Sequence, residues 1–312
     1  MTDISKISEI FNEVHENINK YFFGPREIPV LMSSALLAQG HILLEGVPGV
    51  AKTTLAKFYS ALTGCTFKRI QFTPDLMPTD ITGTVVPSAD FQSSRFIPGP
   101  VFTQVLLGDE INRSPAKTQA ALLEALEEKT VTVEGNTFSL EKPFFVIATQ
   151  NPQELAGTFP LPEAAVDRFI IRIKLSYPDT EQEFQMMKKH QIEPPLPQPL
   201  LESKSIVEYQ NIINNVTISE SLMRYILSII RWTRRHPQTE LGASPRAGIA
   251  LIRATKAIAA LYGRDYGTPD DVKFLAPYVL SHRLRLSYEA EMAGISSSSI
   301  IDNALEKLNL LA

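Results

Sequence analysis

The sequence has a single cysteine, no excess of basic residues and no long apolar run. That cysteine, Cys65, excludes an intrachain disulfide and any metal site built from several cysteines. With a formal net charge of −4, the chain has no general positive field to attract nucleic acid. No apolar run is long enough to span a bilayer, and residues 1–20 lack the layout of a signal peptide. We therefore expect a cytoplasmic protein without a membrane span or a nucleic-acid partner.

Apolar residues make up 44% of the 312 positions, which is enough for a large core and two domains. Strand-like and helix-like segments alternate up to residue 177, a pattern typical of a mostly parallel sheet covered by helices. After that point the strand signal stops and helical patterns continue. We therefore predict an α/β domain over residues 1–177, followed by an all-α domain over residues 178–312. A proline-rich stretch at 194–199 predicts a stiff linker.

A glycine-bearing loop connects a predicted strand at 41–45 with a predicted helix that includes residues 55–59. Glycines let successive backbone N–H groups converge on one anion, and the helix N-terminus adds positive charge at the same point. Lys52 starts that helix, where the dipole disfavours a cation by about 0.3–1 kcal/mol unless an anion is bound. The alternative is a glycine-rich turn with a solvated lysine. The predicted phosphate-binding residues are Gly46, Val47, Pro48, Gly49, Val50, Ala51, Lys52, Thr53 and Thr54.

One position departs from the usual G-x-x-x-x-G-K-[ST] pattern, since Ala51 stands where a second glycine is expected. We expect alanine to be tolerated there with a negative φ. The motif is then off-pattern by one residue and still a phosphate-binding loop.

Two adjacent carboxylates, Asp109 and Glu110, end a buried strand predicted over residues 104–110. Parallel sheets gather ligands at the carboxyl ends of their strands, so we expect the pair beside the phosphate loop. Adjacent carboxylates repel unless a cation lies near them, and nucleotide chemistry needs a metal ion and a positioned water. We predict that Thr53 and Asp109 hold Mg²⁺ while Glu110 orients the attacking water. The alternative is a solvated strand end with Asp109 as a helix cap.

Asn151 and Arg168 flank the next two predicted strands. Asn151 follows a strand at 143–149 and can hydrogen-bond a γ-phosphate or its attacking water; alternatively it forms an ordinary Asn-Pro turn. Arg168 lies just before a strand at 170–175, and its planar guanidinium suits the charge that develops on phosphate in the transition state. The alternative for Arg168 is a surface ion pair with a neighbouring acid.

Arg246 lies in the first turn of a helix predicted to start at Pro245, with Ser244 as its cap. The dipole disfavours a cation there as well, and a phosphate held by the other domain resolves the conflict. We therefore expect Lys52 and Arg246 to lie on either side of one nucleotide, between the two domains. The alternative is an exposed arginine.

Together these residues resemble the motifs of the MoxR family of AAA+ ATPases. Further similar segments extend the resemblance over nearly the whole chain, and the family has the same alanine variant of the loop. The matching stretches are Gly46–Thr54 for Walker A, Val105–Arg113 for Walker B, Ala148–Pro152 for sensor 1, Pro160–Phe169 for the arginine finger and Gly242–Gly248 for sensor 2.

The resemblance implies an AAA+ nucleotide-binding core followed by an α-helical lid. It also implies a ring, commonly a hexamer, in which Arg168 acts on ATP bound to the neighbouring subunit. Two hairpins predicted at 84–101 and 131–140 resemble insertions of this AAA+ branch. The first is at least as consistent with a hairpin that merely covers the sheet. The implied partners are protein clients and a separate protein with a von Willebrand factor A domain.

Our hypothesis is an Mg²⁺-dependent ATPase that hydrolyses ATP to ADP and phosphate and rotates its lid against its core. Such an enzyme remodels or matures protein complexes, including by insertion of metal cofactors. Three alternatives stay open. One is a DNA-acting AAA+ remodeller, which the acidic balance disfavours; another is a small-molecule P-loop kinase, which lacks an evident second-substrate motif; the last is a nucleotide-gated binding module with negligible turnover.

Overall fold

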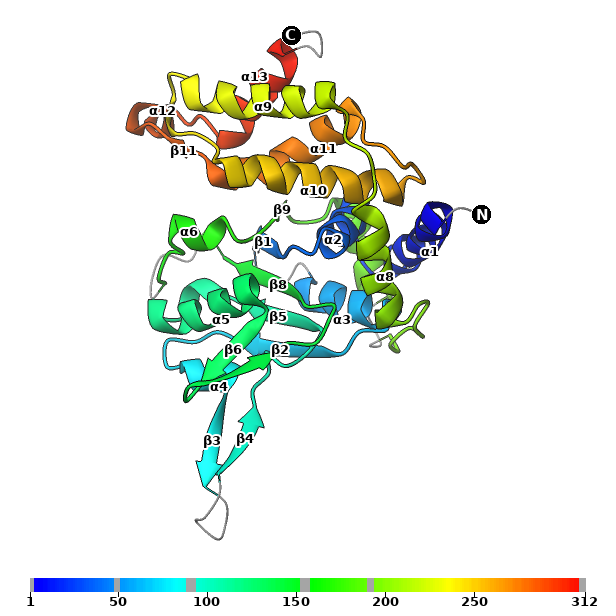
Figure 1. Cartoon of the computed structure of the whole chain (residues 1–312), viewed down its shortest axis with the longest axis vertical. Helices are drawn as coiled ribbons and strands as arrows, with labels where there is room; N and C mark the ends of the chain where they lie inside the picture. Colours follow the sequence, from blue (N-terminus) through cyan, green and yellow to red (C-terminus); the bar gives the residue numbers. More distant parts are fainter. Residues whose placement is uncertain (1–2, 48–50, 88–93, 152–157, 190–193, 309–312) are drawn as a thin grey trace.

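The centre of the molecule is a five-stranded parallel sheet (Figure 1). The computed structural model describes residues 3–47, 51–87, 94–151, 158–189 and 194–308. The strands, in spatial order, are β2 (Phe67–Gln71), β5 (Val105–Asp109), β8 (Phe145–Gln150), β1 (Ile42–Gly46) and β9 (Ile171–Leu175).

The register brings the carboxyl ends of these strands to one edge of the sheet. Gly46 at the end of β1 lies opposite Leu175 of β9, and Asp109 at the end of β5 lies opposite Gln71 of β2. The central strands are buried on both faces, which explains their continuous apolar sequences. The predicted α/β class with a parallel sheet is confirmed.

Alternating side chains of the central strands enter two separate apolar clusters. Leu44 and Leu107 belong to the cluster beneath α1 (Asp3–Ile18), α2 (Glu27–Leu37) and α3 (Lys52–Leu62). Leu43 and Leu106 enter the cluster beneath α5 (Ala116–Glu128) on the other face. The strand period of two therefore lets one sheet hold helices on both sides.

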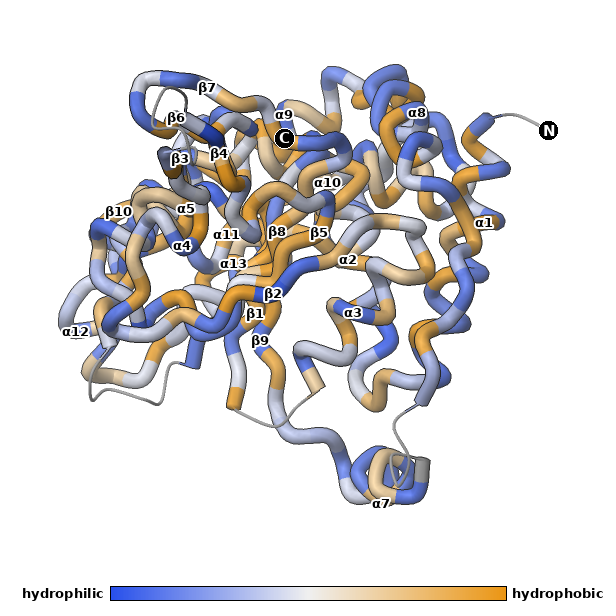
Figure 2. The backbone as a smooth tube through the Cα atoms, turned by 90° about the horizontal axis from the view of Figure 1, so that it is seen from below, coloured by the Kyte–Doolittle hydropathy of each residue, from blue (hydrophilic) through white to orange (hydrophobic). Residues whose placement is uncertain are grey.

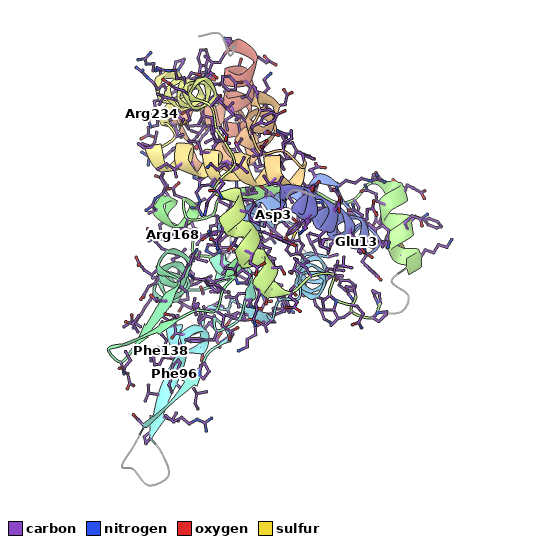
Figure 3. All side chains as sticks on the ribbon, turned by 45° about the vertical axis from the view of Figure 1, so that its right-hand side comes forward. Asp3, Glu13, Phe96, Phe138, Arg168 and Arg234 are labelled. Atoms are coloured by element: carbon purple, nitrogen blue, oxygen red, sulfur yellow. The ribbon has the colours of Figure 1, made fainter. Side chains whose placement is uncertain are left out.

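Two antiparallel hairpins extend from the α5 side of the sheet (Figures 1 and 3). Their facing aromatic rings, Phe96 and Phe138, stack with centroids 4.2 Å apart, so the hairpins contact each other. Both hairpins were predicted, and the tip of the first lies outside the described residues. Their strands are β3 (Gly83–Pro87), β4 (Ser94–Pro98), β6 (Thr130–Val133) and β7 (Asn136–Ser139).

The chain after β9 is mostly helical, as predicted. Pattern reasoning missed a short two-stranded ribbon in this part, β10 (Thr239–Leu241) with β11 (Arg285–Leu286). Along the whole described chain it also missed three helices of one turn or little more, two of them before β9. Those helices are α4 (Pro78–Thr82), α6 (Glu163–Val166) and α12 (Tyr288–Met292). The longer helices are α7 (Thr180–Lys189), α8 (Ser203–Ile213), α9 (Glu220–Arg235), α10 (Pro245–Leu261), α11 (Pro269–Leu280) and α13 (Ser297–Lys307).

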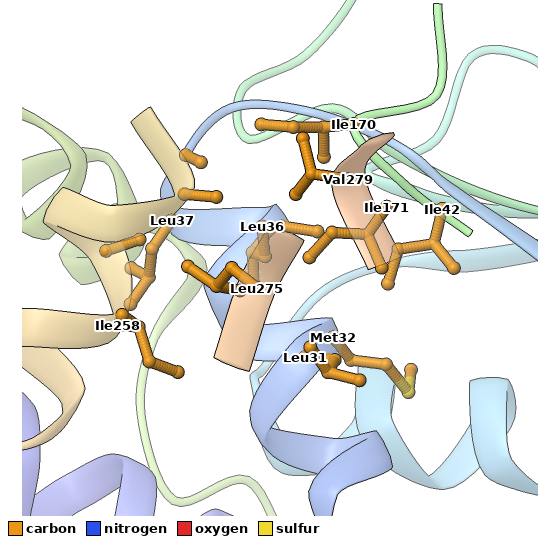
Figure 4. Close-up of a cluster of buried hydrophobic side chains, with 14 of the residues drawn as sticks. Leu31, Met32, Leu36, Leu37, Ile42, Ile170, Ile171, Ile258, Leu275 and Val279 are labelled. Carbon is orange, nitrogen blue, oxygen red and sulfur yellow. The ribbon is translucent and has the colours of Figure 1, made fainter. Parts of the chain in front are cut away.

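The helical part shares an apolar core with the sheet domain. Helix α10 packs directly on α1 and α2, and α11 packs on β9. Figure 4 shows Leu37 of α2 beside Ile258 of α10, and Leu36 beside Leu275 of α11. The division at residue 177 stays a prediction, because one buried cluster runs across it.

Among the described helices, none combines the length and the apolar character that crossing a bilayer needs.

Candidate nucleotide site

The phosphate loop follows β1 at the carboxyl edge of the sheet. Gly46 lies so close to β9 that a Cβ atom there would stand 2.5 Å from the carbonyl oxygen of Leu175. The Nζ of Lys52 donates to the Gly46 carbonyl oxygen at 2.7 Å, which closes the loop across its base. Thr53 and Thr54 follow in the first turn of α3, both partly buried. The predicted loop residues Pro48, Gly49 and Val50 lie outside the described residues.

Ala51 does not adopt the negative φ that we expected; its φ is +56° and its ψ is +26°. The expectation was wrong because the chain enters α3 directly at Lys52, and a left-handed residue makes that turn. For alanine this conformation costs about 1–2 kcal/mol relative to the right-handed region. Backbone strain of this kind persists where the surroundings fix it, and it is common in ligand-binding loops.

Lys52 is half-buried. Burial lowers its pKa, and the nearby charges of Asp109 and Glu110 oppose that shift. Its side chain thus lies between the loop and the acidic pair, where a polyphosphate would supply the missing counter-charge.

The two acids at the end of β5 are held by the neighbouring strand β8. The hydroxyl of Thr149 donates to Asp109 Oδ1 at 2.6 Å and accepts from the Glu110 backbone N–H at 2.9 Å. Glu110 itself has a left-handed backbone, with φ +58°. The chain therefore turns immediately after Asp109, and both acids lie at the carboxyl edge of the sheet.

Polar side chains from β2 contact the acidic pair, and sequence reasoning missed them. Arg69 donates to Asp109 Oδ2 at 2.7 Å, and Gln71 donates to Glu110 Oε2 at 2.7 Å. Arg113 also donates to Glu110, at 3.1 Å. A guanidinium against Asp109 is consistent with a carboxylate that takes a cation partner. The polar residues of β2 gave some signal, but only the sheet order places them beside β5.

The oxygen donors at this edge suit magnesium. Thr53 offers a hydroxyl and Asp109 a carboxylate, the hard ligands that Mg²⁺ combines with phosphate oxygens and water. Asn151 follows β8 at the same edge, and its carbonyl oxygen accepts from the Asn112 amide at 3.3 Å. Within the described ranges no group of three or more acidic, histidine or cysteine side chains forms a complete metal site.

A cavity of about 290 Å³ opens beside Ala51. Its size and its mixture of aromatic and polar residues suit a nucleobase. The residues come from three segments that no motif brought together: the turn after α1, the chain after β9, and α7. They include Phe22, Gly24, Pro25, Tyr177, Gln182 and Met186.

Arg168 lies at the opposite edge of the sheet. The N–H of Ile170, two residues later, donates to the His41 carbonyl oxygen, at the amino ends of β9 and β1. A five-residue strand separates this edge from Gly46, roughly 16 Å at about 3.3 Å per residue.

Arg246 lies beside Arg168 and away from Lys52. Ser244 caps α10 as predicted, accepting from the Ala247 N–H at 3.2 Å. Arg168 lies 2.8 Å from Oε2 of Glu127, and Arg246 donates to Oε1 of Glu127 at 2.9 Å. The expectation that Lys52 and Arg246 of one chain flank one nucleotide is therefore wrong. The reason is that α10 packs on α1 and α2, which carries its first turn to the amino edge.

The segment before Arg168 is fixed by the helical part of the chain. Arg283, only 3% exposed, donates to Asp167 Oδ1 at 2.6 Å and to the Phe169 carbonyl oxygen at 2.9 Å. Burial lowers the pKa of Arg283, and the Asp167 carboxylate opposes the shift. Neither Arg283 nor Glu127 carried a motif signal.

Arg168 and Arg246 line a cavity of about 310 Å³ at this edge. Its lining has five basic side chains and two acidic ones, so it favours an anion. The basic residues are Lys129, Arg168, Arg246, Arg253 and Arg283, and the acidic ones are Glu127 and Asp167.

Two family profiles match the two parts of the chain. The one described as "ATPase family associated with various cellular activities (AAA)" matches residues 41–171, and the one described as "AAA lid domain" matches residues 231–304. With the parallel sheet and the phosphate loop, they define an AAA ATPase whose helical part is its lid.

Similarity to individual proteins identifies the family within the AAA ATPases. The chain is 46% identical over 290 residues to the uncharacterised protein YeaC of Bacillus subtilis, covering 92% of this chain and 90% of that protein. It is 40% identical over 302 residues to the chaperone MoxR1 of Mycobacterium tuberculosis, covering 94% and 80%. A crystal structure from Cytophaga hutchinsonii, named provisionally as an ATPase, superposes with a TM-score of 0.90 at 41% identity, covering 98% and 96%. The chain belongs to the MoxR family of AAA+ ATPases.

Proposed function

We propose that the chain hydrolyses ATP to ADP and phosphate with Mg²⁺ as cofactor. Lys52 and the N-terminus of α3 bind the phosphates, and Gly46, Val47 and Ala51 shape the described ends of the loop. Thr53 and Asp109 would hold Mg²⁺, which when bound screens the phosphate oxygens. Glu110 orients the attacking water and accepts its proton, and Asn151 hydrogen-bonds the water or the γ-phosphate. The half-buried Lys52 beside two carboxylates, with a pKa lowered by burial, supports this assignment.

Each ATP is shared between two copies of the chain. Arg168 and Arg246 lie together at the amino edge, so neither reaches the phosphate loop of its own chain. A head-to-tail neighbour presents both guanidinium groups to that loop, where they offset charge in the transition state. The pairing of these arginines on one carboxylate carries the proposal. A closed head-to-tail arrangement is a ring, and the family resemblance favours a hexamer.

The task of the ATPase is the remodelling or maturation of protein clients. The relative MoxR1 is named a chaperone, which supports this direction. The stacked hairpins β3–β4 and β6–β7 offer a surface to a client, and insertion of a metal cofactor is one form of such maturation. A separate protein with a von Willebrand factor A domain is the partner that the resemblance suggests.

Mixing two inactive variants tests the shared site. Arg168→Ala lacks the arginine that acts on the neighbour's ATP, and Lys52→Ala lacks phosphate binding. Each variant alone should therefore release little phosphate. A mixture should recover turnover, because Lys52→Ala copies lend Arg168 to intact loops. Proven mixed oligomers without recovery would contradict sharing. Phosphate found on a metabolite instead of in solution, or turnover that requires DNA, would favour the kinase or the DNA-acting remodeller.

A further inference from the structure

Helix α7 stands apart from the body of the molecule (Figure 2). None of its side chains from Thr180 to Lys188 is buried. The inner face, with Gln182 and Met186, lines the cavity beside the phosphate loop. The outer face presents Phe184 and Met187, which are 58% and 68% exposed and one helical turn apart. This helix therefore offers an uncovered apolar pair directly beside the nucleotide site.

Acidic side chains precede that pair in the helix, and the exposed Lys188 follows it. Asp179, Glu181 and Glu183 are all exposed at the start of α7. The outer face of α7 is thus apolar at its centre and negative at its N-terminal end.

The edge that carries Arg168 and Arg246 is positively charged and also exposes an apolar side chain. Ile249, 59% exposed, follows Arg246 by one turn of α10 and lines the same basic cavity. Five basic side chains against two acidic ones make this cavity positive. Arg168 lies at the left of Figure 3, and α7, the light-green helix at the right, lies on the far side of the molecule. The two surfaces therefore cannot meet within one chain.

We propose that the outer face of α7 docks on the Arg168–Arg246 edge of a second copy of this chain. The contact is heterologous, and it rests on the shared site proposed above. Phe184 and Met187 pack around Ile249 of the next copy, while the acidic start of α7 faces its basic cavity. Because α7 also lines the cavity beside the loop, this docking brings the neighbour's arginines toward the bound phosphates. Docking of α7 thus completes each nucleotide site with residues of the neighbouring copy.

Charge substitution on α7 tests the contact through assembly. Phe184→Lys with Met187→Lys removes the apolar pair and adds charge that the basic edge repels. Self-association, followed by sedimentation velocity across a concentration series, should weaken at least roughly tenfold to a hundredfold, the loss expected for even one of the two apolar side chains kept in water. The matched control is Met223→Lys with Leu227→Lys, an exposed pair on α9 that should leave assembly unchanged. Equal assembly of the α7 variant and the original chain would overturn the proposal.

Cross-linking identifies the surface on which α7 docks. Cys65 is buried and burial raises its pKa to about 11, so it does not compete in mild oxidation. Copies with Met187→Cys mixed with copies with Ile249→Cys should form disulfide-linked oligomers, whereas Met187→Cys mixed with Leu227→Cys should not. Dimers of Met187→Cys alone would overturn the proposal in favour of a symmetric α7 contact.

The mixing assay separates this proposal from the proposed function. Recovery of turnover by Arg168→Ala with Lys52→Ala should disappear when both carry the α7 substitutions, and persist with the α9 substitutions. Recovery that survives the α7 substitutions contradicts the docking and leaves the shared site standing. Absence of recovery in the unsubstituted mixture contradicts the shared site itself.

Discussion

Arg168 and Arg246, which are 78 positions apart in the sequence, bind the two oxygens of one carboxylate, that of Glu127. One arginine precedes β9 of the core and the other begins α10 of the lid. The Arg246 and Arg168 guanidinium groups lower the pKa of Glu127, so the carboxylate stays charged. Glu127 therefore positions the two arginines together and ties core to lid at the edge where the neighbour's nucleotide is proposed to lie.

Glu127→Gln should lower kcat several-fold and leave the KM for ATP nearly unchanged. The amide keeps one acceptor oxygen, so one of the two arginines loses its anchor, while the phosphate loop is untouched. Steady-state phosphate release at several ATP concentrations measures both constants. Glu124→Gln, an exposed carboxylate on the same helix, serves as control. A rise in KM with unchanged kcat would place Glu127 in ATP binding instead.

Glu110→Gln should retain ATP binding and lose about 10²–10⁴ in turnover, the usual contribution of a general base. Lys52 keeps its contact with the Gly46 carbonyl oxygen and its Asp109 neighbour, and the new amide can still contact Gln71. Fluorescent-nucleotide titration and phosphate release distinguish binding from hydrolysis. Glu128→Gln, at an exposed carboxylate of α5, should keep both. Full turnover in the Glu110 variant would remove that residue from its role.

Arg283→Met should destabilise the fold by about 3–5 kcal/mol, because it leaves the Asp167 carboxylate without its buried partner. The carbonyl of Phe169 loses a donor as well. Denaturant unfolding measures the loss, and adding Asp167→Asn should return part of it. The neighbouring Arg285, in a surface pair with Glu240, is the comparison: Arg285→Met should cost far less than Arg283→Met, because water screens an exposed ion pair. Similar losses in both variants would argue against a special role for the buried pair.

Stability should fall as the pH drops from about 6.5 towards 4. Burial lowers the pKa of His15 and His41 from 6.5 to about 4, so over this range the unfolded chain binds more protons than the folded one. The expected loss at pH 5 is about 2 kcal/mol for each histidine. His41 also uses both ring nitrogens: Nδ1 accepts from the Val146 N–H, and Nε2 lies 3.1 Å from the Leu126 carbonyl oxygen.

Urea unfolding at pH 7 and pH 5 checks this expectation. His41→Gln lowers stability at both pH values but should reduce the difference between them. An unchanged pH dependence in that variant would show that His41 titrates normally.

Local sequence patterns were sufficient to predict which residues lie at the carboxyl edge of the sheet. The order of strand, glycine loop and helix located Lys52, and an acidic pair at a strand end located Asp109 and Glu110. Each inference needed only neighbours in sequence and the rule that parallel strands end together. The cap at Ser244 was predictable for the same reason, since capping is a property of a few consecutive residues.

Contacts between distant segments were not predictable. Gln71 meets Glu110 only because β2 lies beside β5, and Glu127 meets Arg246 only because the lid crosses to the amino edge. The helix dipole at Arg246 predicts a nearby anion but does not identify its source. In the described chain that anion is the carboxylate of Glu127. Ala51 shows a further limit, because its φ depends on the whole loop.

The cluster that joins α2, α10 and α11 has a mechanical consequence. Leu37, Ile258 and their neighbours are buried, so rotating the lid against its own core would expose apolar side chains to water. The rotation of the lid against the core of the same chain, which the sequence led us to expect, is therefore costly. With the ATP hydrolysis and the shared sites proposed above, we expect motion between whole copies instead, each copy moving as a rigid body.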